Sequence, residues 1–102
     1  MRVVWSPLAI DRAEEAAAYI AGDSMDAALA WLDGLFHATD RLERFPQSGR
    51  IVPEIGLLEY REIVYRHSHR IVYRVEKTRV AILTVRNFAQ LLDLGEIIDP
   101  GE

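Results

Sequence analysis

Residues 60–86 read YREIVYRHSHRIVYRVEKTRVAILTVR, and this stretch determines the fold class. Apolar and polar side chains alternate along it in three runs, which is the period of a β-strand with one buried face. Two short polar breaks, at residues 67–68 and 76–78, separate the runs. Alternating runs joined by such short breaks predict three antiparallel strands in a meander, with one face covered and one face partly open.

The chain before this stretch has the pattern of two helices. Ser6-Pro7 is typical of a helix start, because serine caps the first turn and proline lacks the N–H that would be unpaired there. Apolar residues recur at helical spacing to about residue 21, and a polar turn at 22–24 precedes a second helix that runs to about residue 45. The apolar stripe of the second helix comprises Met25, Ala28, Trp31, Leu32, Leu35, Phe36, Thr39, Leu42 and Phe45. A turn this short predicts an antiparallel helical hairpin.

A short β-prone run at residues 3–5 precedes the hairpin and completes the order β-α-α-β-β-β. This order predicts an α+β fold, in which the helices cover one face of an antiparallel sheet. The length of 102 residues predicts a single domain over residues 1–102. Residues 93–102 are mixed apolar and acidic, so both a packed and a flexible tail are consistent with them.

Charge is distributed unevenly along the chain. The net charge is −4, which excludes a protein that coats nucleic acid through its overall charge. Residues 60–86, in contrast, carry 7 Lys/Arg against 2 Asp/Glu. This locally basic segment fits an acidic partner or a phosphate backbone. The sequence has no run that reads as a signal peptide or membrane span, so we expect a cytoplasmic protein without a membrane partner.

Four arginines fall at predicted strand positions: Arg61, Arg70, Arg74 and Arg86. The planar guanidinium of arginine binds phosphate or carboxylate groups in a bidentate manner, so the cluster is a candidate partner surface. The same residues also fit the solvent face of a sheet, where they would pair with Glu62 and Glu76. The pattern alone leaves both interpretations open.

No self-contained catalytic or metal site is predicted. His67 and His69 lie in a predicted turn without a third ligand nearby, and the chain has no cysteine, so we expect no metal and no cofactor. His37 lies on the second helix near its apolar stripe and reads as a boundary residue. The serines occupy predicted caps and turns, and no pair of carboxylates has surroundings that would separate their pKa values.

Several segments resemble the RelE/ParE toxin superfamily. They are residues 5–9 (WSPLA), 42–50 (LERFPQSGR), 52–54 (VPE), 60–63 (YREI), 69–75 (HRIVYRV) and 82–86 (ILTVR). The resemblance covers nearly the whole chain in the family's order. It implies the RelE/ParE-like fold and the toxin component of a type II toxin–antitoxin system, held silent in a hetero-oligomer by a cognate antitoxin whose C-terminal part wraps the toxin.

Two activities occur in the family that the chain resembles. RelE-like members cleave mRNA in the ribosome, whereas ParE-like members bind and poison DNA gyrase. Arg70 matches a functional position of the ribonucleases, but ParE-like chains often carry arginine there too. Asn87 and Phe88 stand where the ribonucleases place acid–base or basic residues, and residues 87–102 contain no Lys or Arg.

These differences favour a ParE-like gyrase poison that acts by binding and has no catalytic residue. The first alternative is a ribosome-dependent mRNA endonuclease with Arg70 as its catalytic residue. The second alternative is an inactive homologue that serves only as an antitoxin-binding partner. Sequence-specific nucleic-acid binding by this chain is not expected under any of the three.

The resemblance also suggests where the partners bind. The basic sheet face would contact gyrase through Arg61, Arg74 and Arg86. The antitoxin is hypothesised to occupy the groove between the helical hairpin and the sheet. The side chains expected to contact it are Ala16, Ile20, Trp31, Leu35 and Phe36.

Overall fold

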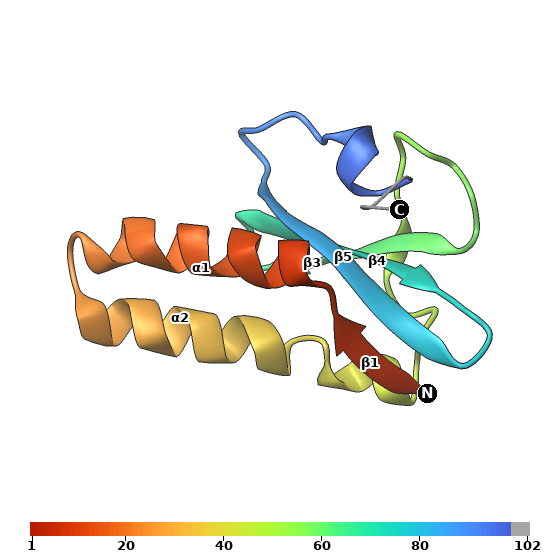
Figure 1. Ribbon diagram of the computed structural model, residues 1–102, viewed down its shortest axis with the longest axis horizontal. Helices are drawn as coiled ribbons and strands as arrows, with labels where there is room; N and C mark the ends of the chain where they lie inside the picture. The colour runs from red at the N-terminus through yellow and green to blue at the C-terminus, as the bar shows by residue number, and fades with distance from the viewer. Residues whose placement is uncertain (99–102) are drawn as a thin grey trace.

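The computed structural model describes residues 1–98, which form two helices packed on one face of a five-stranded sheet (Figure 1). The elements are β1 (Arg2–Trp5), α1 (Pro7–Ala21), α2 (Met25–His37), the 3₁₀ turn η1 (Asp40–Glu43), β2 (Arg50–Ile51), β3 (Tyr60–Tyr65), β4 (His69–Val75), β5 (Arg79–Asn87) and the 3₁₀ turn η2 (Leu94–Glu96). The predicted α+β architecture is confirmed. The two-residue strand β2 is an addition that the sequence pattern did not indicate.

The sheet has the strand order β1-β5-β4-β3-β2. Strands β3, β4 and β5 form the predicted antiparallel meander. Strand β1 pairs in parallel with the first half of β5, from Arg2 opposite Arg79 to Trp5 opposite Ile82. The second half of β5, residues 83–87, therefore extends beyond the end of β1. This part of the sheet edge faces α1 and the C-terminal segment around η2.

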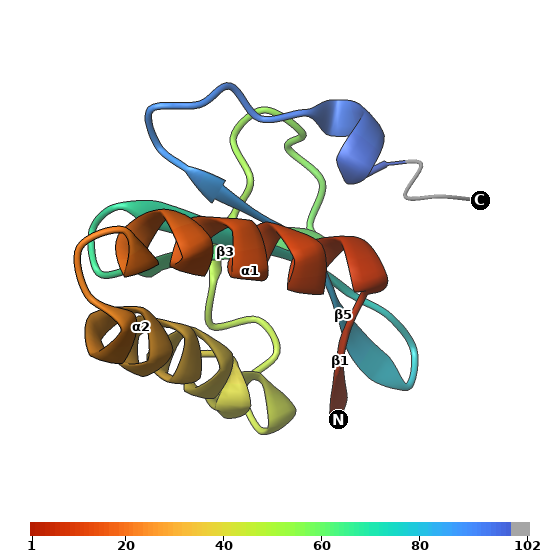
Figure 2. The same ribbon diagram turned by 60° about the vertical axis from the view of Figure 1, so that its left-hand side comes forward.

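Helix α1 begins where the sequence predicts. The Oγ of Ser6 accepts a hydrogen bond from the N–H of Ala9 and donates one to the carbonyl of Leu83, so the cap also ties the helix to β5. Ala9 and Ala13 are fully buried. Their small side chains let α1 lie close to the sheet, with α2 beside it on the same face (Figure 2).

Helix α2 is shorter than predicted, because it ends at His37 rather than near residue 45. The Oγ1 of Thr39 donates to the carbonyl of Phe36 and accepts from the indole N–H of Trp5. This side-chain bonding replaces helical hydrogen bonds, and the chain continues as η1. The two ends of the predicted stripe are wrong as core positions, since Met25 is 62% and Phe45 63% exposed.

Both faces of the sheet carry a hydrophobic core. The larger cluster lies beneath the helices and includes Trp31, Leu35, Ile71, Tyr73 and Ile82. The smaller cluster lies on the opposite face and includes Val52, Tyr60, Val72, Leu83 and Ile97. The loop after β2 and the segment around η2 thus cover much of the face that alternation predicted to be partly open, whereas Val64 on β3 remains exposed. Residues 99–102 of the predicted tail lie outside the described residues.

Candidate partner-binding groove and arginine clusters

A groove of about 670 Å³ lies between α1 and the second half of β5. Helix α1 contributes Ala16 and Ile20 to its wall, and β5 contributes Val85 and Arg86. The groove exists because β1 ends opposite Ile82 and leaves the rest of that sheet edge without a strand neighbour. Its lining combines apolar side chains with charged ones, which suits an amphipathic partner segment.

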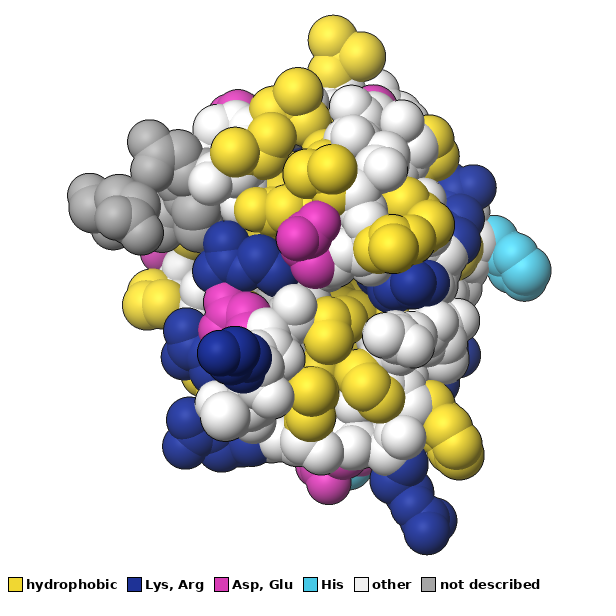
Figure 3. Space-filling model, turned by 90° about the vertical axis from the view of Figure 1, so that its right-hand side faces the viewer, with side chains coloured by type: hydrophobic (Ala, Val, Ile, Leu, Met, Phe, Trp, Pro, Cys, Tyr) yellow, Lys and Arg dark blue, Asp and Glu magenta, His cyan; other side chains and the backbone are white. Residues whose placement is uncertain are grey.

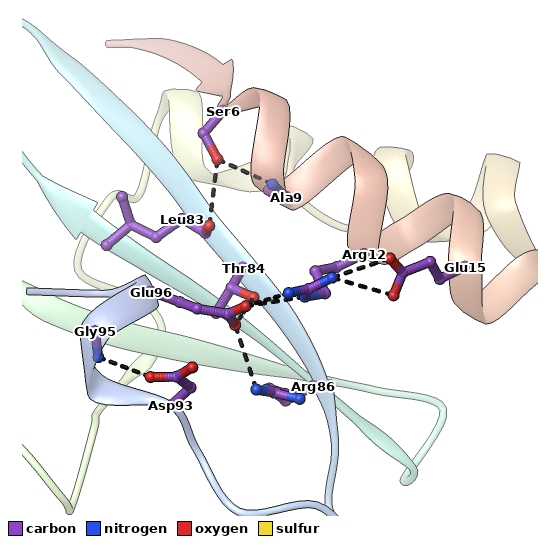
Figure 4. Close-up of polar contacts among 10 residues, drawn as sticks. All are labelled: Ser6, Ala9, Arg12, Glu15, Leu83, Thr84, Arg86, Asp93, Gly95 and Glu96. Carbon is purple, nitrogen blue, oxygen red and sulfur yellow. Dashed lines mark hydrogen bonds and ion pairs between the residues drawn. The ribbon is translucent and has the colours of Figure 1, made fainter. Parts of the chain in front are cut away.

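The buried carboxylate of Glu96 lies between Arg12 and Arg86, two residues that line the groove (Figure 4). Its Oε2 accepts hydrogen bonds from the Nε and Nη2 of Arg12, at 3.0 and 2.5 Å. Its Oε1 accepts from the Oγ1 of Thr84 at 3.1 Å. Glu96 therefore joins α1, β5 and η2, although Arg12 lies 84 residues earlier in the chain. The hydrogen bond to Glu96 is the main cause that raises the pKa of Arg12.

Arg86 is the other cation of the groove. Its Nη2 lies 3.5 Å from the Oε1 of Glu96, which is an ion pair but too long for a good hydrogen bond. Its Nε is buried and has no hydrogen-bond partner, and among the residues that the structure describes no other buried side-chain nitrogen or oxygen lacks one. Buried polar groups are almost always paired, so the unpaired Nε of Arg86 indicates a hydrogen bond that the described residues do not supply.

His69 also lines the groove, at the start of β4. Its ring packs edge to face on Trp31, with 4.9 Å between the ring centroids, and its Nδ1 lies 2.7 Å from the Oγ of Ser68. Burial lowers the pKa of His69, so the ring is neutral near pH 7. It therefore adds a polar but uncharged group to the groove.

Arg70 occupies a separate ionic cluster on the sheet face turned away from the helices, the face that it shares with Arg86 across the β4–β5 ladder. Its Nε and Nη2 bond to Glu62, which is fully buried, and its Nη1 and Nη2 bond to Glu54 at 2.7 and 2.8 Å. Arg50 adds a second cation on Glu62, and the Phe88 ring lies 5.7 Å from the Arg70 guanidinium. The hydrogen bond from Arg70 lowers the pKa of Glu54 to about 2, while these carboxylates raise the pKa of Arg70.

The three arginines predicted to contact the target are not brought together. The Arg61 guanidinium is tied to backbone carbonyls, including those of Gly49 and Leu58. Arg74 pairs with Glu76 near the turn between β4 and β5. Arg86 lies opposite Arg70, four positions along β4 from Arg74, which is roughly 13 Å at strand spacing.

A family model describes proteins that share this fold and sequence pattern. The model for the "ParE toxin of type II toxin-antitoxin system, parDE" matches residues 3–92. The chain belongs to the ParE toxin family. The matched range of this ParE-family chain begins inside β1, includes both helices and strands β2 to β5, and ends just before η2.

A solved structure described as the chromosomal ParDE TA system from P. aeruginosa has the same fold as this ParE-family chain. The two chains superpose with a TM-score of 0.71 at 17% identity, covering 85% of this chain and 95% of the other. No curated protein sequence matches the ParE-family chain.

The residues predicted to contact an antitoxin fall into two groups in the ParE-family chain. Ala16 and Ile20 line the groove. Trp31 and Leu35, in contrast, are 5% and 0% exposed and belong to the core. Phe36 is half-buried and packs against the Trp5 ring with 4.5 Å between the centroids.

Sequence analysis missed Arg12, His69 and Glu96 as neighbours of the groove, because they come from three distant segments. Within residues 1–98, no three His, Cys, Asp or Glu side chains are arranged to hold a metal ion. None of the helices described for the ParE-family chain is long and apolar enough to cross a membrane.

Proposed function

We propose that this ParE-family toxin arrests growth by binding and poisoning DNA gyrase, and that a cognate antitoxin neutralises it by occupying the groove between α1 and β5. The observation that carries the proposal is the family match over residues 3–92. The groove supports the second half of it, because Ala16 and Ile20 offer an apolar wall beside charged groups. Such a surface suits the apolar side of an amphipathic segment.

The environment of Arg70 supports binding over RNA cleavage. A ribonuclease needs a cation that is available to stabilise charge on the scissile phosphate. Arg70 is only 6% exposed, and the carboxylates of Glu54 and Glu62 engage its guanidinium nitrogens. Residues 87–98 offer no Lys or Arg as a substitute.

The contact with gyrase is proposed to include Arg74. Arg74 and Glu76 form an ion pair near the β4–β5 turn, with Lys77 and Arg79 beside them and Arg2 next to Arg79 across the parallel ladder. These four cations outnumber the single carboxylate between them. Figure 3 views this end of the molecule, where Lys and Arg side chains lie on both sides of an area rich in hydrophobic side chains.

Supercoiling by purified gyrase tests the proposal. The toxin is added to gyrase, ATP and relaxed plasmid, and linear DNA is scored after protein digestion. We expect linear DNA to accumulate, and an equimolar amount of the antitoxin encoded with the toxin to prevent it. A folded toxin that arrests growth without linear DNA would contradict gyrase poisoning and direct the assay to mRNA cleavage on ribosomes. A folded protein that arrests no growth would indicate an inactive homologue.

A further inference from the structure

We infer that Arg86 is a recognition point for a carboxylate, supplied by an Asp or Glu side chain of the partner segment that docks between α1 and β5. The inference rests on the proposed function, because it takes that partner to be the antitoxin. It adds the chemistry by which the groove would select its partner.

Arg86 lacks a full hydrogen-bonding partner in the free chain. Its Nε is buried and makes no hydrogen bond, and its Nη2 is 3.5 Å from the nearest carboxylate oxygen of Glu96. The free chain thus keeps one nitrogen of the Arg86 guanidinium removed from water without a partner, while the side chain as a whole is 18% exposed. Buried donors in this condition are costly, so an acceptor that reaches Arg86 gains more than one placed on an exposed arginine.

The carboxylates near Arg86 are already bonded to other groups. Glu96 cannot serve Arg86 fully, because it already accepts two hydrogen bonds from Arg12 and one from Thr84. Glu15 is bonded to Arg12 and is largely exposed. Arg86 is therefore the less compensated of the two cations in the groove.

The charges around the groove favour a carboxylate over a phosphate group. Glu15 and Glu96 stand close to Arg12, so a dianionic phosphate group would meet two like charges. A single carboxylate on a short aliphatic chain fits better. Its carbon atoms can lie on Ala16 and Ile20 while its oxygens bond to the guanidinium of Arg86.

A matched pair of small probes tests the site without any partner protein. Hexanoate and hexanamide have the same chain length and differ only in the head group, which is an anionic carboxylate in one and a neutral amide in the other. We expect hexanoate to shift the Nε–Hε resonance of Arg86 saturably in ¹H–¹⁵N spectra, and hexanamide to bind roughly tenfold more weakly, because charge-assisted hydrogen bonds are about twice as strong as neutral ones. Equal shifts from the two probes, or none, would overturn the inference.

The second arm uses the antitoxin encoded with the toxin. Arg86→Gln should weaken antitoxin binding about tenfold or more, since it removes a charged partner. The control Arg41→Gln changes an exposed arginine of η1 outside the groove and should not weaken it. Unchanged affinity for Arg86→Gln would overturn the inference and leave the proposed function intact. Wild-type toxin that binds hexanoate at Arg86 but not the antitoxin would contradict the proposed function and support the carboxylate site.

Discussion

Arg70 and Arg86 lie directly opposite each other in the β4–β5 ladder, yet their guanidinium groups are held by different carboxylates. Like charges in such a position repel and destabilise a sheet. Glu54 and Glu62 compensate Arg70, and Glu96 compensates part of the charge of Arg86. The loop after β2, strand β3 and the segment around η2 thus supply the charges that make this pairing tolerable, while the Nε of Arg86 makes no hydrogen bond.

Replacing Glu62 should destabilise the fold strongly. Glu62→Gln removes a fully buried carboxylate that holds both Arg50 and Arg70, and breaking such a pair costs about 3–5 kcal/mol. Glu76 is the matched control, because it also holds two arginines but is 23% exposed. Urea unfolding of Glu76→Gln should show a loss below about 1 kcal/mol. Equal losses for the two variants would contradict the assigned role of burial.

The ion pair between Glu54 and Arg70 should make stability depend on pH in the acid range. The pKa of Glu54 is about 2 in the fold against 4.5 normally, so its stabilising contribution is complete above pH 4.5 and is lost as pH falls towards 2. The difference in unfolding free energy between wild type and Glu54→Gln should therefore shrink over this range. Urea titrations at several pH values measure it, with the exposed Glu59→Gln as the control. A difference that stays constant down to pH 2 would refute the assignment.

Replacing Glu96 should loosen the C-terminal segment. Glu96→Ala removes the acceptor of Arg12 and Thr84, and hydrogen bonds to charged groups contribute about 1.5–3 kcal/mol. Amide hydrogen exchange at residues 93–98 should accelerate roughly ten- to hundredfold, while β3 and β4 exchange as before. Glu15→Ala also removes a partner of Arg12, but an exposed one, and should leave the segment protected. Protection that survives Glu96→Ala would show that Ile97 packing suffices.

Gly34 should not tolerate alanine, although helices usually gain about 1 kcal/mol from that change. A Cβ at this position of α2 would overlap the hydroxyl of Tyr65, which donates a 2.8 Å hydrogen bond to the carbonyl of Trp31. We expect Gly34→Ala to lose about 1–3 kcal/mol in urea unfolding. Adding Tyr65→Phe removes the overlapping oxygen, so the double variant should be more stable than the sum of the single effects. Strict additivity would disprove the clash.

Reversing the charge of Arg74 should separate toxicity from folding. Arg74→Glu places an anion next to Glu76, in the cluster proposed to contact gyrase. At equal folded abundance we expect at least about tenfold less gyrase-dependent linear DNA, because like charges brought together at an interface cost several kcal/mol. Arg41→Glu changes net charge equally at an exposed position of η1 and should act like wild type. Full activity of Arg74→Glu would remove this residue from the target contact.

Local patterns in the sequence predicted most of the secondary structure. Alternation located β3, β4 and β5, and the Ser6 cap located the start of α1, because both signals depend on neighbouring residues. The predicted end of α2 was wrong because Thr39 bonds to Trp5, which is far away in the chain. The sequence did not predict most of the cover on the second face of the sheet. The segments that form this cover, the loop after β2 and the residues around η2, have no periodic pattern.

The groove was predictable only on its apolar side. Helical spacing placed Ala16 and Ile20 towards the sheet, but it also placed Trp31 among the contact residues although the core encloses it. The contact between Arg12 and Glu96 spans 84 residues, and nothing local distinguishes either side chain from other surface charges. Long-range ion pairs of this kind depend on the completed fold.

The parallel pairing of β1 with β5 has a consequence for the order in which the protein is made. Synthesis proceeds from the N-terminus, so β1, α1 and α2 leave the ribosome before the strand on which they pack exists. Val80, Ile82 and Val85 of that strand complete the cluster around Ala9 and Ala13. If synthesis stops before β5 is made, β1 has no strand to pair with, and only the α1 wall of the groove is present. The native surfaces of this toxin can therefore form only after β5 has been synthesised.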